Sequence, residues 1–215
     1  MSQKIYTFCD KVMILNMAQS IDKMVINRIY GKKRGWVFTP NHFFDLGSRT
    51  AVAQSLSRLV KTGTIRRLSR GLYDYPEKHR SLGELPPNYE RIAQALTGRD
   101  NIKIQPSGAY AANMLGLSEQ VPARIVFLTD GKNKKIQVNK HQIILKNTTP
   151  KNMATAGRIS GVVIHALRYL KQENVNDGTI DVLRKKLSSG DKRQLIKDIR
   201  LAPVWIGDIF RRLQD

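Results

Sequence analysis

The sequence predicts an α+β protein, with an N-terminal winged helix-turn-helix domain and a larger mixed α/β C-terminal domain that ends in helices. Two observations support this fold class. Over residues 20–78 the expected elements run helix, strand, helix, helix and hairpin, and only Leu46, Gly47 and Ser48 separate the last two helices. After a proline-rich segment, strand and helix patterns alternate, and from about Thr155 apolar residues recur at helical spacing.

The first helix and strand are predicted from an N-cap, a helix stop and a run of bulky residues. Ser20 is a favourable N-cap for a helix in which Ile21, Met24, Val25 and Ile29 share one face. Gly31 ends this helix, and residues 31–35 form a basic loop. The bulky side chains of residues 36–39 then predict a short strand.

Two further helices and a hairpin complete the expected N-terminal domain. Thr39 and Pro40 suit the N-cap and first position of a short second helix. Ser48 caps a third helix that ends at Gly63. Residues 64–75 read as two strands around a turn, so this region predicts the wing.

The expected domains are an N-terminal extension at 1–19, the winged helix-turn-helix at 20–78, a linker at 79–88 and the C-terminal domain at 89–215. In the C-terminal domain we expect helices and strands in an alternating order, followed by helices. These are a helix at 89–98, a strand at 102–105, a helix at 107–116 with Ser107 as N-cap, a strand at 123–131, a hairpin pair at 134–139 and 142–147, and helices from 155, near 178–187 and at 191–214, the last broken or kinked by Pro203.

The charge indicates the kind of partner. Thirty-seven Lys and Arg against seventeen Asp and Glu give a net charge of +20. Residues 20–80 hold thirteen Lys and Arg and four Asp and Glu, so 13 − 4 = +9 falls on this segment. Nucleic acid is the commonest partner of such a chain, and an anionic membrane surface or an acidic protein is a rarer one.

The third helix has two different sides when its residues are placed about 100° apart. One side is apolar, with Val52, Leu56, Leu59 and Val60. The other presents only hydrogen-bonding or cationic groups, at Thr50, Gln54, Ser57, Arg58 and Lys61. Gln pairs with adenine and Arg with guanine, and Ser or Thr with either, so this side is suited to reading bases. A merely solvated outer face is the plain alternative.

The hairpin favours the nucleic-acid interpretation over a solvated basic surface. Arg66, Arg67 and Arg70 lie within five residues of one another, and phosphates would relieve their mutual repulsion. Lys32, Lys33 and Arg34 would add a second phosphate clamp. The predicted DNA-contacting residues are Lys32, Lys33, Arg34, Arg49, Thr50, Gln54, Ser57, Arg58, Lys61, Thr64, Arg66, Arg67, Ser69 and Arg70. Arg70, at the turn, either enters a minor groove or only grips phosphate.

Catalytic, metal and membrane sites are not expected. Asp130 and His141 could form an acid–base pair, but nothing in their spacing supports this, because no partner nucleophile or metal ligand is evident in the sequence. The single Cys9 allows no intramolecular disulfide and fits a cytoplasmic protein, and no apolar run is long enough for a transmembrane helix. We therefore expect no cofactor, no metal and no enzymatic activity.

Residues 28–76 and 105–131, with the Thr-Thr-Pro at 148–150, resemble the AbiEi-like antitoxins of type IV toxin–antitoxin (abortive infection) systems. The resemblance implies a winged helix-turn-helix that binds repeats in its own promoter and represses it. It also implies a C-terminal domain that opposes a nucleotidyltransferase-type toxin without a stable complex. It places Thr50, Gln54, Ser57 and Arg58 on the recognition helix, and Arg66, Arg67 and Arg70 on the wing. Residues 1–18 do not match the family pattern.

The expected function is that of a DNA-binding transcriptional autorepressor and antitoxin. Two alternatives stay open. The C-terminal domain could be an enzyme that reverses or blocks the toxin's chemistry. The basic surface could instead bind RNA, such as tRNA.

Overall fold

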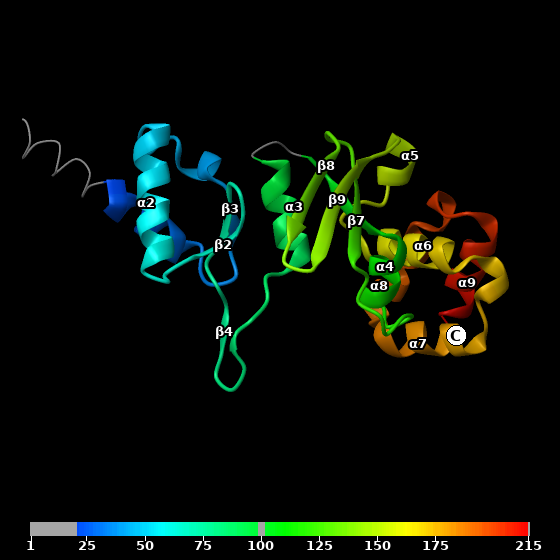
Figure 1. Cartoon of the computed structure of the whole chain (residues 1–215). Coiled ribbons are helices and arrows are strands. Elements are labelled where there is room, and N and C mark those ends of the chain that lie inside the picture. Colours follow the sequence, from blue (N-terminus) through cyan, green and yellow to red (C-terminus); the bar gives the residue numbers. More distant parts are fainter. Residues whose placement is uncertain (1–20, 99–101, 215) are drawn as a thin grey trace, which may run out of the picture. The chain divides into compact units, whose positions relative to one another are not determined.

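A computed structural model describes residues 21–98 and 102–214, which form a mixed α+β protein with helices at its C-terminal end (Figure 1). The backbone divides into two compact units, residues 1–99 and 100–215. The expected Ser20 cap, the extension at 1–19 and Cys9 lie outside the described residues. Across the described ranges, no helix combines the length and apolar character needed to cross a membrane.

The first unit contains the expected order of elements. Residues 21–31 are helical and precede β1 (Val37–Phe38), η1 (Pro40–Phe43), α2 (Arg49–Lys61), β2 (Arg66–Ser69) and β3 (Leu72–Asp74). The three strands form one antiparallel sheet in the order β1-β3-β2. The sequence predicted the strand, the long helix and the hairpin in these places.

The local signals at α2 are confirmed, and the short helix before it differs from expectation. Ser48 Oγ accepts a hydrogen bond from the Ala51 backbone N–H at 3.2 Å, as an N-cap does. The segment after Thr39 is the short 3₁₀ helix η1, in which His42 N–H donates to Thr39 O at 3.1 Å. It is too short to form an α-helix before the turn at Gly47.

The turn before α2 is packed closely on the first helix. A Cβ at Gly47 would lie 2.9 Å from Ile21 Cδ1, so a larger residue there would require the Ile21 side chain to shift. Arg28 joins the same elements, because it pairs with Asp45 at 2.7 Å and donates to His42 O at 2.6 Å. The hydrogen bond to Asp45 raises the pKa of Arg28 above its ordinary value.

The core of the first unit is formed by both helices and the sheet. Of the residues expected on the apolar face of the first helix, Val25 and Ile29 are buried, whereas Met24 is 39 % exposed. The buried residues of this core are Val25, Ile29, Phe38, Phe43, Val52, Leu56 and Ile65.

The segment expected as a linker carries a small hairpin, β4 (Lys78–His79) and β5 (Gly83–Glu84), before α3 (Tyr89–Thr97). Asn88 Oδ1 caps α3 and accepts from two backbone N–H groups at 2.8 and 3.1 Å. Helix α3 packs against β1 and belongs to the first compact unit, although the sequence division assigned it to the C-terminal domain. Its apolar face is compatible with either unit, so composition could not place it.

The second unit contains one four-stranded sheet. Its elements are β6 (Ile104–Ser107), α4 (Gly108–Met114), β7 (Arg124–Thr129), β8 (Lys134–Val138) and β9 (His141–Asn147). The strand order is β6-β7-β9-β8, in which β7 and β9 are parallel and the other pairs antiparallel. The β8–β9 hairpin was predicted, but insertion of β9 between β7 and β8 was not.

The rest of the second unit is helical, as the apolar spacing predicted. The elements are α5 (Pro150–Met153), α6 (Ile159–Leu170), η2 (Gln172–Asn174), α7 (Asp177–Lys186), α8 (Ser189–Lys197), η3 (Ile199–Leu201) and α9 (Val204–Arg212). Pro203 stands immediately before α9 and so separates it from α8, as expected. Phe210 is fully buried in the helical core and Trp205 packs against it.

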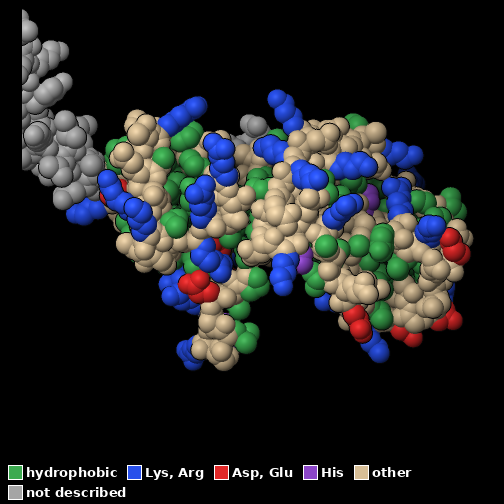
Figure 2. All heavy atoms as spheres, viewed as in Figure 1, with side chains coloured by type: hydrophobic (Ala, Val, Ile, Leu, Met, Phe, Trp, Pro, Cys, Tyr) green, Lys and Arg blue, Asp and Glu red, His purple; other side chains and the backbone are tan. Residues whose placement is uncertain are grey.

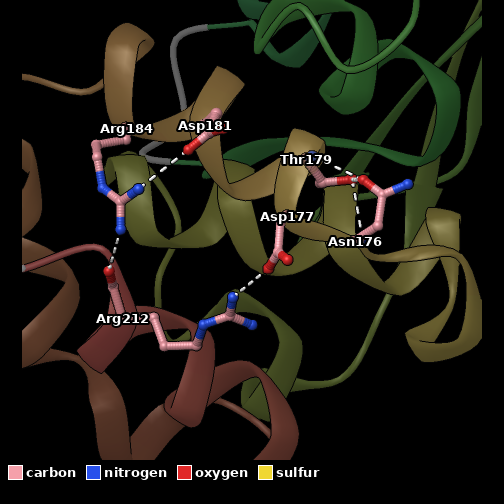
Figure 3. A network of polar contacts seen from close by, with 6 residues as sticks. All are labelled: Asn176, Asp177, Thr179, Asp181, Arg184 and Arg212. Atoms are coloured by element: carbon pink, nitrogen blue, oxygen red, sulfur yellow. Dashed lines mark hydrogen bonds and ion pairs between the residues drawn. The ribbon is translucent and has the colours of Figure 1, made fainter.

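Ion pairs join α7 to the end of α9 (Figure 3). Arg212 pairs with Asp177 at 2.6 Å, and Arg184 donates to the backbone oxygen of Arg212 at 2.9 Å. Arg184 also pairs with Asp181, one turn away on α7, at 3.0 Å. These contacts hold the last described turn of the chain against α7.

Candidate nucleic-acid interface

The outer side of α2 is polar and open to solvent. Thr50, Gln54, Ser57 and Lys61 are all exposed, while Val52 and Leu56 on the opposite side are completely buried. Helix α2 therefore packs its apolar side against the core of the first unit, and the side predicted to contact bases faces solvent. Lys and Arg side chains are numerous on the visible face of this unit (Figure 2).

Two cations of this surface have close partners that sequence reasoning did not identify. Arg58 pairs with Asp22 of the first helix at 2.6 Å, so the outer side of α2 includes one carboxylate neighbour. Both side chains are well exposed, and such a pair contributes little stability and can exchange its partner. The Arg49 guanidinium lies over the Phe44 ring, 5.2 Å from its centroid.

The hairpin that follows α2 ends in an arginine turn. Arg70 and Gly71 connect β2 to β3, and Gly71 has a φ of +72°, which favours glycine. The pairing shifts between Arg67 and Ser69, so the strand bulges just before the turn. Arg67 and Arg70 are exposed, and within the described part of the chain neither forms an ion pair.

Arg66 has a different environment from the other two arginines. Its guanidinium donates to both carboxylate oxygens of the buried Asp74, at 3.1 and 2.6 Å, and to Leu85 O at 2.9 Å. Glu84 lies 3.6 Å away. The hydrogen bond to Asp74 raises the pKa of Arg66 above its ordinary value. Arg66 therefore closes the base of the hairpin, and we remove it from the phosphate-contacting set.

Thr64 and Ser69 are half-buried and contribute less surface than expected. The Thr64 hydroxyl lies 3.0 Å from that of Thr62, so it is already hydrogen-bonded at the end of α2. Thr64 lies between α2 and the hairpin, and Ser69 is the last residue of β2, beside the turn.

The basic loop lies at the opposite end of β3 from the arginine turn. Val37 of β1 pairs with Asp74, whereas Leu72 adjoins the turn. Lys32, Lys33 and Arg34 precede β1 and thus sit at the hairpin base. Arg34 donates to Pro76 O at 3.0 Å and lies over the Tyr75 ring. The structure does not bring these residues to the turn.

The acid–base pair considered from sequence is not assembled. Because β7 and β9 are parallel, Asp130 after β7 and His141 at the start of β9 lie at opposite ends of the sheet. The Asp130 carboxylate accepts from the Lys103 backbone N–H at 2.9 Å. Among residues 21–98 and 102–214, no cluster of His, Cys, Asp or Glu has the arrangement of a metal site.

A buried carboxylate in the second unit was not predicted. Asp198 is 3 % exposed and accepts hydrogen bonds from Arg158, Ser160 and Gln194, the last at 2.9 Å. Its oxygens are thus compensated by a guanidinium and two neutral donors. The cluster connects the start of α6 to the end of α8, and its contacts indicate a structural role.

The second unit contains a basic stretch of sequence, although one of its cations, Arg158, is paired with Asp198. Residues 131–172 include no Asp or Glu and nine Lys or Arg, namely Lys132, Lys134, Lys135, Lys140, Lys146, Lys151, Arg158, Arg168 and Lys171. Three of these lysines, Lys134, Lys135 and Lys146, line a shallow pocket of about 300 Å³ on β8 and β9. A one-sign stretch of this length favours contact with a polyanion.

Comparison with known proteins identifies a family whose function is unknown. The model of DUF6088, described as a family of unknown function, matches residues 24–195. No curated protein matches the sequence significantly.

Proposed function

The chain belongs to the DUF6088 family, and we propose that its first unit is a winged helix-turn-helix that binds double-stranded DNA. One observation carries the proposal: a helix with an exposed polar and cationic side is followed directly by a hairpin whose exposed arginines lack acidic partners among the described residues. In a winged helix-turn-helix, the helix would enter the major groove and the hairpin would lie along the phosphate backbone.

The proposed interface has two kinds of contact. Gln54, Thr50 and Ser57 are the base-reading candidates, because their side chains are exposed and neutral. Lys61, Arg67 and Arg70 are the phosphate-contacting candidates. Arg58 becomes available if the DNA phosphate displaces Asp22.

The resemblance to AbiEi-like antitoxins extends the proposal. On that basis the DNA is a set of repeats in the protein's own promoter, and binding represses transcription. The second unit opposes a nucleotidyltransferase-type toxin without a stable complex, and no catalytic residue is assigned to it.

Binding to the DNA upstream of its own gene tests the first part. Fluorescence anisotropy compares that duplex with a scrambled one at several salt concentrations. Arg67→Ala should weaken binding to both duplexes and reduce the slope of log affinity against log salt by about 0.9. Gln54→Ala should mainly reduce the preference for the promoter sequence, by about 1–3 kcal/mol. Arg80→Gln, which changes the charge equally on the exposed segment between β4 and β5, is the matched control.

Two outcomes would refute specific repression. One is equal affinity for promoter and scrambled duplex near 150 mM salt. The other is a loss in Arg80→Gln as large as that in Arg67→Ala. The antitoxin part is tested by co-expression with an adjacent nucleotidyltransferase gene, and growth arrest that the protein does not relieve would contradict it.

The carboxylate-free stretch at 131–172 supports a second candidate, binding of structured RNA by the second unit. Competition between labelled promoter duplex and folded tRNA distinguishes DNA binding from RNA binding. If tRNA binds more tightly and Lys132→Ala with Lys140→Ala weakens tRNA alone, RNA is the preferred ligand. The same variants leave DNA affinity unchanged if DNA binds only through the first unit.

A further inference from the structure

The first unit contains a pocket of about 560 Å³ between the basic loop and α3. Four cations and two aromatic rings contribute to its wall, namely Lys32, Lys33, Arg34, Arg91, Trp36 and His42. None of the described residues that line it is an Asp or Glu. Glu77 lies 4.0 Å from the Arg91 guanidinium, and both side chains are about half exposed.

The loop is shaped to bring these cations together. Lys33 has a φ of 65° and Gly35 a φ of 84°. A Cβ at Gly35 would lie 1.9 Å from Arg91 Nη1, so the guanidinium rests directly on the loop backbone. A lysine in the left-handed region is an unfavourable conformation that the surroundings must maintain, and such conformations concentrate at functional sites.

The loop is also anchored from behind. Gly35 N–H donates to Tyr75 O at 2.6 Å, and Arg34 lies 4.6 Å from the Tyr75 ring centroid. The loop backbone and the Arg34 guanidinium are therefore held in place, while Lys32 and Lys33 are exposed beside the pocket. Cations gathered in this way repel one another, and a polyanion that enters between them is strongly attracted.

The aromatic part of the wall is fixed as well. The Trp36 ring packs 4.5 Å from that of Phe38 and meets His42 edge-on at 5.6 Å. Indole rings are good stacking surfaces for nucleic-acid bases. An inorganic phosphate would use the cations but leave this surface and most of the volume unused.

We propose that this pocket binds a nucleoside triphosphate, with its phosphates among Lys32, Lys33, Arg34 and Arg91 and its base against Trp36. The volume falls within the range of about 300–1,000 Å³ for small-molecule sites. A duplex backbone follows a surface, whereas these groups converge in a hollow at the far end of β3 from the arginine turn. None of the pocket residues belongs to the outer side of α2 or to that turn, so the proposal does not depend on the DNA contacts proposed there, and it replaces the phosphate clamp that the sequence predicted for Lys32, Lys33 and Arg34.

Titration of the full-length protein with ATP and GTP, followed by calorimetry, tests the pocket. Arg91→Gln and Lys33→Gly each remove one cation, and Lys33→Gly also suits the left-handed backbone. Each should weaken triphosphate binding about tenfold or more, while Arg80→Gln should change it less than about twofold. Tripolyphosphate should compete with the nucleotide, and adenosine alone should bind far more weakly than ATP.

Three results would overturn the proposal. The first is no heat of binding at millimolar ATP or GTP. The second is an equal loss of triphosphate affinity in Arg91→Gln and Arg80→Gln, which would show that the nucleotide is attracted only by the net positive charge of the protein. The third is a loss of duplex DNA affinity in Arg91→Gln without nucleotide binding, which means a phosphate clamp for DNA. Arg67→Ala separates the two proposals, because it should weaken DNA binding and leave nucleotide binding unchanged.

Discussion

Replacing Arg66 should destabilise the first unit, because its guanidinium compensates a buried carboxylate. The Asp74 side chain is 2 % exposed, and both of its oxygens accept from Arg66. Removing one partner of a buried ion pair costs about 3–5 kcal/mol, since the other charge stays buried and unpaired. The Arg66 side chain is 30 % exposed, so water can partly replace it, and we expect about 3 kcal/mol for Arg66→Ala.

Urea unfolding followed by circular dichroism and tryptophan fluorescence measures this loss. Arg67→Ala is the control on the same strand, and as an exposed substitution it should change the unfolding free energy by less than about 0.5 kcal/mol. Replacing both partners, Arg66→Met with Asp74→Leu, should recover most of the stability, because no charge then remains buried. The reasoning is refuted if Arg66→Ala is as stable as Arg67→Ala and both lose DNA affinity alike.

Three further substitutions test the packing and titration of single residues. Gly161→Ala should destabilise the second unit by about 1–3 kcal/mol, because its Cβ would lie 2.7 Å from the backbone oxygen of Thr155. The control Gly190→Ala, whose Cβ would lie 3.6 Å from its nearest neighbour, should be neutral or stabilising in thermal melts. Ser55→Ala should raise the unfolding free energy by about 1 kcal/mol in urea, because its hydroxyl is buried without a hydrogen-bond partner, and a loss would contradict this. Burial lowers the pKa of His165 below its ordinary value, and the positive charge of Arg168 lowers it further. The His165 imidazole therefore binds a proton more readily in the unfolded chain than in the folded protein. The free energy of unfolding should therefore be highest above about pH 6.5 and should decrease as the pH falls below that value. In urea titrations between about pH 7.5 and 5, His165→Gln should make this decrease smaller.

The sequence by itself determined most elements of the first unit. Ser48 and Gly63 bound α2 through capping and a left-handed φ, which are local properties of the chain. The spacing of Val52 and Leu56 fixed which side of α2 is buried. The polar side was therefore predictable, because periodicity places side chains on a helix without knowledge of its neighbours.

Tertiary structure decided which charges are available. Arg66 and Arg67 are adjacent in sequence, yet only Arg66 meets a buried carboxylate, because strand pairing places Asp74 opposite it. Composition could not distinguish them. The Arg91 guanidinium likewise reaches the basic loop through the packing of α3 on β1, so the pocket has no signature in the order of residues. Long-range contacts assign partners to charges, whereas local sequence assigns only their spacing.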